Sequence, residues 1–261
     1  MNTESNESTP SYFNAYQHLK LNRNNKGVLL VEMHSDGGPI IFSAKDHTEF
    51  TEAFYRIGRD LDNKVIILTG KGDWMSQIDA DSFLNNPDPY ALIKIHDEGV
   101  QILENLLNIR VPVIAAIEGK AHIHTEYALT ANIIVASEST TFMDLPHFNF
   151  GVVPGDGIFS TWSYRAGAGR AQDFLLKTES IDVQTAKDWG VVSEIVEDGK
   201  TVIRAREIAD LFLSKPAVTL RNTRAHFSQP LKEKIVREVS FGLTLETQAM
   251  VEVMMMQNEN N

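Results

Sequence analysis

The sequence contains no cysteine among its 261 residues. This absence excludes a disulfide scaffold, a zinc or iron–sulfur site held by thiolates, and a catalytic thiol. Positive charge is scarce as well, because 24 Lys and Arg residues stand against 35 Asp and Glu residues and the formal net charge is −11. That balance argues against nucleic acid and anionic membranes as partners, unless a local basic patch exists.

Long apolar stretches are missing too. A membrane-spanning helix needs about 20 consecutive apolar residues, whereas the longest candidates here, such as residues 111–117, have the length of a strand. Residues 1–10 are polar and contain no basic segment followed by an apolar one, so they lack the pattern of a signal peptide. We therefore predict a cytoplasmic protein without membrane association, and a disordered tail over residues 1–11.

The rest of the chain has the composition of a globular domain, with 43% hydrophobic and 23% charged residues. Residues 18–23 and 28–33 alternate apolar and polar side chains around Asn-Asn-Lys-Gly, which predicts a β-hairpin. Segments with helical spacing then alternate with short apolar strands, an order typical of an α/β fold with crossover connections. The predicted helices cover residues 46–61 and 92–109, and the predicted strands cover residues 65–68, 111–117, 133–136 and 140–143.

The character of the chain changes near residue 201. Residues 201–214, 218–227 and 231–256 all have helical spacing. We therefore divide the chain into an α/β core over residues 12–200 and a C-terminal helical section over residues 201–261.

A His-x-His pair, His122 and His124, follows the strand that ends at residue 117. Loops after strands often carry the functional residues of α/β proteins. In an extended segment both rings lie on one face, and this spacing also occurs among metal ligands. Two surface histidines in a polar loop are the alternative, and the pair alone does not decide between them.

His147 and Asp156 flank a segment rich in turn residues. A proline and two glycines around Asp156 predict a sharp turn, so that the chain folds back and His147 faces Asp156. A carboxylate that accepts the Nδ1–H of an imidazole makes the other nitrogen a usable base near neutral pH. The alternatives are that Asp156 caps a helix over residues 158–166 and that His147 is a buried structural histidine.

Glu246 lies in an apolar stripe of the last helix. The other members of the stripe are Val239, Leu243, Met250 and Val253. A carboxylate is costly to bury without a partner, so an inward-facing Glu246 is a candidate functional residue. At the edge of the stripe it would instead reach water, and the apolar Phe241 and Leu245 leave the inward face of this helix undecided.

Five segments resemble the enoyl-CoA hydratase/isomerase (crotonase) superfamily, and the resemblance extends over nearly the whole chain. They are residues 65–72 (Val-Ile-Ile-Leu-Thr-Gly-Lys-Gly), 111–119 (Val-Pro-Val-Ile-Ala-Ala-Ile-Glu-Gly), 133–142, 151–157 (Gly-Val-Val-Pro-Gly-Asp-Gly) and 186–196. The resemblance implies an α/β fold built as a spiral of repeated ββα turns, followed by a helical trimerisation section. It also implies a homotrimer or a dimer of trimers.

Two departures from the CoA-dependent members point to a particular branch. The Gly-Gly-Gly run that helps to form their oxyanion hole is replaced by residues 121–126, Ala-His-Ile-His-Thr-Glu, and their catalytic Glu after a proline is replaced by His147. These changes are similar to the β-diketone hydrolases typified by 6-oxocamphor hydrolase. That branch cleaves the C–C bond between two carbonyl groups by a retro-Claisen reaction and uses no CoA, so we expect no cofactor and no metal.

The functional residues of this branch correspond by motif to His124, His147, Asp156 and Glu246. The resemblance implies that His147, oriented by Asp156, is the general base on water, and that His124 donates a hydrogen bond to a substrate carbonyl. Glu246 would hold a water or a histidine in place.

The expected substrate is a small β-diketone, with cyclic β-diketones as the first candidates. Two further residues are expected to bind it. They are Ser76, through its backbone N–H in the loop after the strand at residues 65–68, and His122. Pocket-lining candidates are Phe42, Trp74, Phe83, Phe148 and Phe159.

The sequence is also compatible with three other functions. The chain is alternatively an acyl-CoA hydratase or isomerase with altered acid/base residues, or a hydrolase with a metal held by His122, His124, His147 and Asp156. The third is a non-catalytic binder on the same fold, including an RNA-binding one, which the net charge of −11 disfavours.

Overall fold

A computed structural model describes residues 10–84 and 88–259. Most of the predicted tail lies outside these residues. Its last position, Ser11, begins a short 3-10 helix, η1 (Ser11–Asn14), because Tyr12 and Phe13 are buried against the core.

The core is one six-stranded sheet with the order β1-β2-β4-β6-β8-β11. Its strands are β1 (Leu19–Arg23), β2 (Val28–Met33), β4 (Val65–Gly70), β6 (Val113–Ile117), β8 (Ile133–Ser137) and β11 (Glu194–Val196). The predicted hairpin is confirmed, since β1 and β2 are antiparallel, while all later neighbours are parallel. Parallel strands require crossover connections, and these bring the carboxyl ends of β4, β6 and β8 to one edge.

Short strands form a second layer beside that edge. They are β3 (Ile41–Phe42) paired with β5 (Gln77–Ile78), and β7 (Lys120–Ala121), β9 (Thr141–Phe142) and β10 (Ile181–Asp182) in a three-stranded sheet. Each turn of the chain thus runs from a long strand to a short strand and then towards a helix. This is the predicted spiral of ββα turns, and the fold prediction is confirmed.

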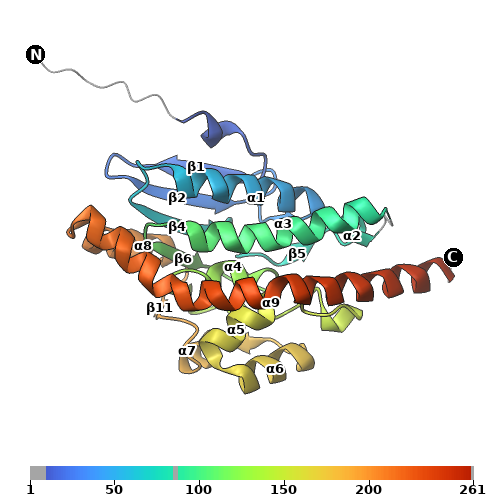
Figure 1. The fold of residues 1–261 in the computed structure, drawn as a ribbon. Helices are drawn as coiled ribbons and strands as arrows, with labels where there is room; N and C mark the ends of the chain where they lie inside the picture. Colours follow the sequence, from blue (N-terminus) through green and yellow to red (C-terminus); the bar gives the residue numbers. More distant parts are fainter. Residues whose placement is uncertain (1–9, 85–87, 260–261) are drawn as a thin grey trace, which may run out of the picture.

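Helices cover both faces of the large sheet, which is why its central strands β4 and β6 are buried throughout. On β4, Ile66 and Leu68 join the main core with α1 (Ala44–Arg59) and α3 (Pro89–Asn108). Val65 and Ile67 point the other way and pack in a second cluster with α8 (Thr201–Leu213). The alternation follows from the two-residue period of a strand, and Figure 1 shows the layers.

Smaller helices follow the parallel strands. They are α2 (Asp81–Leu84), α4 (Thr125–Leu129), η2 (Phe148–Phe150), α5 (Ile158–Ala166), α6 (Ala168–Lys177) and α7 (Val183–Asp188). Figure 1 shows α5, α6 and α7 together on one side of the long C-terminal helix α9.

The C-terminal helical section differs from its prediction in one respect. The two helices expected over residues 218–227 and 231–256 are a single helix, α9 (Ala217–Glu259), with Pro230 inside it. Proline removes one backbone donor, but the helix continues because Leu231 and Ile235 remain packed in the core. Among the described residues, no helix is long and apolar enough to span a membrane.

Candidate active site

His124 occupies an unusual backbone position at the start of α4. Its φ of 46° lies in the left-handed region, which residues other than glycine seldom adopt. The ring is buried between Phe42, at a centroid distance of 4.2 Å, and Tyr127, which stacks on it at 4.8 Å. The indole N–H of Trp74 also donates to the backbone carbonyl of His124 at 3.3 Å. A strained conformation held by so many contacts is typical of a functional residue.

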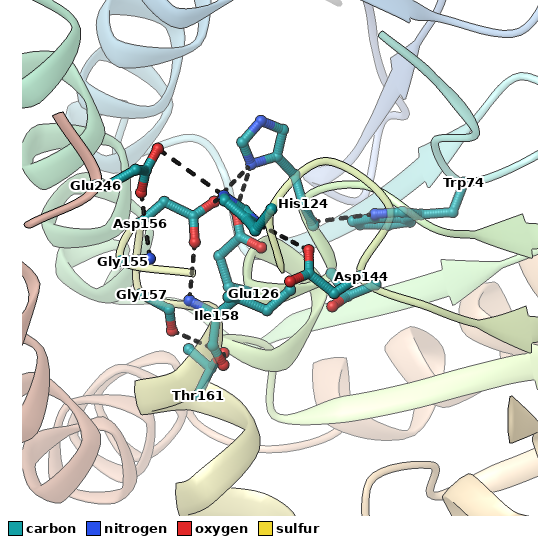
Figure 2. A network of polar contacts seen from close by, with 12 residues as sticks. Trp74, His124, Glu126, Asp144, Gly155, Asp156, Gly157, Ile158, Thr161 and Glu246 are labelled. Atoms are coloured by element: carbon teal, nitrogen blue, oxygen red, sulfur yellow. Dashed lines mark hydrogen bonds and ion pairs between the residues drawn. The ribbon is translucent and has the colours of Figure 1, made fainter. Parts of the chain in front are cut away.

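One ring nitrogen of His124 faces two carboxylates. Nδ1 lies 2.6 Å from Glu126 Oε1 and 3.4 Å from Asp156 Oδ2. Figure 2 shows the other nitrogen turned away from both carboxylates. Nε2 is therefore the atom of His124 that is left for a substrate.

His147 is also buried and contacts three carboxylates. Its Nδ1 lies 2.7 Å from Asp144 Oδ1, while Nε2 lies 3.5 Å from Asp156 Oδ2 and 3.9 Å from Glu246 Oε1. The prediction that His147 and Asp156 come together agrees with this geometry. The predicted orientation by Asp156 through Nδ1 does not, because Asp144 is the residue at Nδ1 and Asp156 faces Nε2.

Asp156 combines the two interpretations that the sequence left open. Its Oδ1 accepts a hydrogen bond from the Ile158 N–H at 3.1 Å, at the start of α5. Its Oδ2 is buried and faces both histidines without a hydrogen bond of ordinary length. One oxygen thus fixes the turn, and the other is available to the site.

Glu246 faces inward, as a member of the stripe that contains the buried Val239 and Leu243. Its Oε2 accepts a hydrogen bond from the Gly155 N–H at 3.2 Å, as Figure 2 shows. The approach is possible because Gly155 and Gly242 meet without side chains, and a Cβ on either would overlap the other's backbone. A glycine pair therefore brings the Glu246 carboxylate of α9 to the turn that carries Asp156.

Neighbouring carboxylates raise the pKa of both histidines. Burial alone lowers the pKa of His124, but the charges of Glu126 and Asp156 outweigh it and raise the pKa to about 9. Burial likewise opposes the charge on His147, and Asp144 and Asp156 raise its pKa well above the usual value.

The pKa values of the neighbouring carboxylates shift in opposite directions. Burial favours the neutral form of Asp156, but His147 and His124 lower its pKa below the usual value. Burial and the Asp156 charge raise the pKa of Glu246 to about 8 and that of Glu126 to about 7. Neighbouring groups with divergent pKa values are a common signature of acid–base chemistry.

His122 and Ser76 lie outside this cluster. His122 Nε2 bonds to the Thr141 hydroxyl at 2.9 Å, and burial lowers the pKa of its ring. The two histidines of the His-x-His pair therefore do not converge, because the left-handed turn at His124 ends the extended segment. Ser76 follows Met75, whose carbonyl accepts the His122 N–H at 2.9 Å. The loop after β4 thus runs beside the His122–His124 segment.

The sequence analysis missed three residues of the cluster. Glu126 lies two residues after His124, and Asp144 lies three residues before His147. Closeness in the sequence to a predicted histidine was therefore the signal that could have found them. His47 on α1 is buried, with its ring 5.7 Å from that of His124. It lies three residues before Phe50, which is buried on the same helix, so helical spacing back from Phe50 finds it.

The pKa of His47 shifts in the opposite direction from those of His124 and His147. Its Nδ1 is buried without a hydrogen-bond partner in the described part of the chain. Burial and the neighbouring His124 charge lower its pKa to about 3. The imidazole of His47 is therefore neutral beside the charged His124.

The metal-ligand set considered from the sequence is not assembled, since His122 lies apart. Two other groups have ligand atoms within 4.8 Å of one another, and they share Asp156. They are His124, Glu126 and Asp156, and His147, Asp156 and Glu246. In both groups histidine nitrogens face carboxylate oxygens, so we describe the cluster as an ion-paired network.

Comparisons with known proteins agree with this fold. The solved structure of ABDH, a β-diketone hydrolase from the cyanobacterium Anabaena sp. PCC 7120 bound to (S)-3-oxocyclohexyl acetic acid, is 42% identical. It superposes with a TM-score of 0.92 and covers 94% of this chain and 99% of its own.

Two curated relatives act on CoA esters by name. "Probable enoyl-CoA hydratase 1, peroxisomal" of Arabidopsis thaliana is 28% identical over 76% of this chain and 72% of its own length. Carnitinyl-CoA dehydratase of Proteus mirabilis is 30% identical over 64% of each chain. The family described as enoyl-CoA hydratase/isomerase matches residues 23–257. The chain therefore belongs to the enoyl-CoA hydratase/isomerase family.

Proposed function

We propose that this protein hydrolyses a small β-diketone, cleaving the C–C bond between its two carbonyl groups without CoA. The observation that carries the proposal is the position of Asp156 Oδ2 between two imidazoles, 3.4 Å from His124 Nδ1 and 3.5 Å from His147 Nε2. A β-diketone has two carbonyl oxygens to polarise, whereas a thioester has one. The similarity to the Anabaena β-diketone hydrolase supports the same substrate class.

The two histidines act as hydrogen-bond donors to the two carbonyl groups. His124 donates from Nε2 to the carbonyl that becomes the enolate, because Glu126 and Asp156 engage its Nδ1. His147 donates from Nε2 to the carbonyl that is attacked, because this nitrogen lies beside Asp156 and Glu246. Each prepositioned donor in a water-excluded site lowers the barrier by about 2.7–4 kcal/mol.

We assign the general base to Glu246 in place of His147. A protonated imidazole cannot accept a proton from water, and the ion pairs keep His147 protonated. Glu246 has a pKa raised to about 8, which suits proton exchange near neutral pH. The ionised Asp156 offers its free oxygen to the same water and keeps both imidazoles charged.

The reaction then balances within these residues. Water transfers one proton to Glu246, and the hydroxide adds to the carbonyl carbon beside His147. The C–C bond breaks, and its electron pair forms an enolate whose oxygen accepts the Nε2–H bond of His124. Glu246 returns the proton to the enolate carbon, which leaves a keto acid and the starting protonation state.

Ser76 and His122 lie outside the cluster, and their role as substrate contacts stays a proposal. We propose that the Ser76 N–H assists His147 at the attacked carbonyl oxygen, since its loop runs beside the His122–His124 segment. His122 would act through Nδ1, because the Thr141 hydroxyl occupies Nε2.

We also propose that α9 mediates assembly into a homotrimer or a dimer of trimers. Large apolar side chains on this helix face solvent in the single chain, at exposures well above those of the core. They are Val218, Phe227, Val236, Phe241, Met255 and Met256. Native mass spectrometry should give three or six copies, and a monomer would contradict this assembly.

Parallel substrate panels test the function. Purified protein should convert cyclic 1,3-diketones into keto acids and should leave acyl-CoA thioesters unchanged. Turnover of an acyl-CoA with no turnover of any diketone would contradict the proposal and favour the hydratase or isomerase alternative.

A further inference from the structure

We propose that Glu126 is a positioning residue that holds His124 with Nδ1 protonated and Nε2–H presented to the substrate. The inference rests on the proposed function, since it specifies how the enolate donor is maintained. Its basis is the 2.6 Å contact between Glu126 Oε1 and His124 Nδ1, inside a site where both side chains are buried.

The burial of Glu126 has no other explanation in its surroundings. Its side chain is fully buried, and its second oxygen, Oε2, has no hydrogen-bond partner within the described residues. A buried carboxylate with one side-chain partner destabilises a fold relative to an apolar residue of similar size. Such a cost is typical of a residue that serves the site rather than the core.

The position of Glu126 on α4 also fits this role. Glu126 lies two residues after His124, where the left-handed φ of 46° turns the ring. Tyr127 stacks on one face of the ring with an angle of 3° between the planes, so the ring can rotate little. With the plane fixed by Tyr127 and Nδ1 fixed by Glu126, Nε2 has one direction in which to donate.

Asp156 cannot replace Glu126 in this function. Its contact with His124 Nδ1 is longer, at 3.4 Å, and it also faces His147 Nε2 at 3.5 Å. Asp156 is therefore shared by the two histidines, whereas Glu126 serves His124 alone, as Asp144 serves His147. Titratable side chains that face His124 from the surrounding elements are Glu126, Tyr127, His47, Asp156 and Glu246.

Glu126→Gln tests the inference, because glutamine keeps the size and removes the charge. The pKa of His124 should fall, so the loss of kcat/KM should grow with pH and reach about tenfold or more near pH 8.5. A purely structural role would lower activity equally at every pH, and that result would overturn the inference. Glu118→Gln is the matched control, since Glu118 accepts hydrogen bonds from Thr201 and, within the described residues, bonds to no histidine.

Nitrogen-15 NMR of the His124 ring gives a readout independent of turnover. In the parent protein both ring nitrogens should carry protons at pH 7. In Glu126→Gln the ring should lose one of these protons at a lower pH than it does in the parent, because the pKa of His124 is lower. Unchanged titration of His124 in the variant would overturn the inference. If the parent turns over no diketone but the pKa of His124 is lower in Glu126→Gln than in the parent, the proposed function is wrong. The positioning of His124 by Glu126 is then still supported.

If Glu126→Gln does not fold, the parent spectrum still decides. The Nδ1 proton of His124 should resonate downfield, as expected for a short bond to a carboxylate. An unprotonated Nδ1 at pH 7 would contradict the role of Glu126.

Discussion

Gly155 and Gly242 meet backbone to backbone at the point where α9 crosses the turn before α5. A Cβ atom on either residue would overlap the main chain of the other. Because the Glu246 carboxylate accepts the Gly155 N–H one helical turn away, this contact sets the distance between α9 and the histidines. The general base of the proposed mechanism thus depends on two residues that have no side chain.

Gly242→Ala should therefore displace Glu246 and reduce kcat by about 10²-fold or more, with a loss of about 1–3 kcal/mol in unfolding free energy from overpacking. Turnover assays and denaturant titrations measure the two effects. Gly169→Ala on α6 is the control, since a Cβ there meets no atom within 4 Å. Full activity in Gly242→Ala would show that the close contact does not position the base.

Asp144→Asn should lower kcat by about 10²-fold, because it removes the charge that keeps His147 protonated at Nδ1. The fold should be retained, since asparagine can still accept the Nδ1–H. Asp182→Asn, which alters an exposed cap of α7, serves as the comparison. Equal activity in the two variants would return the orienting role to Asp156, as first expected from the sequence.

The dependence of kcat/KM on pH should be bell-shaped with an alkaline optimum. Activity should rise as Glu246 loses its proton, with a pKa of about 8, and fall as His124 loses its proton, with a pKa of about 9. A rate profile between pH 6 and 10 checks both limbs. A rate that falls steadily from pH 7 would mean that Glu246 acts only in its protonated form.

His47 should stay neutral wherever the protein is folded, because its pKa is lowered to about 3. NMR titration should show no protonation of the His47 ring between pH 5 and 9, in contrast to His124. His47→Phe should then keep the packing against Phe42 and Phe83 but alter KM for the diketone. A His47 ring that titrates near pH 6.5 would refute this account of its environment.

Much of the fold was predictable because its signals are local. The apolar runs of β4, β6 and β8 and the Asn-Asn-Lys-Gly turn report burial and turn geometry directly. The break predicted between residues 227 and 231 does not occur, since tertiary packing of the apolar stripe carries α9 through Pro230. Local propensity does not include that packing energy.

The sequence predicts which residues form the site but not which atoms of these residues contact one another. His124, His147, Asp156 and Glu246 converge as the motifs implied. The partner of each histidine nitrogen depends on ring rotation and on a left-handed turn, which no residue pattern specifies. For this reason Asp144 was missed although it stands three residues from His147.

The origin of the oxygen in the product tests the central claim most directly. In water enriched in ¹⁸O, a cyclic 1,3-diketone should give a keto acid with one ¹⁸O atom in its carboxylate, and Glu246→Gln should form it at least about 10²-fold more slowly. A product without ¹⁸O, or undiminished turnover in Glu246→Gln, would contradict hydrolysis by a water that Glu246 activates.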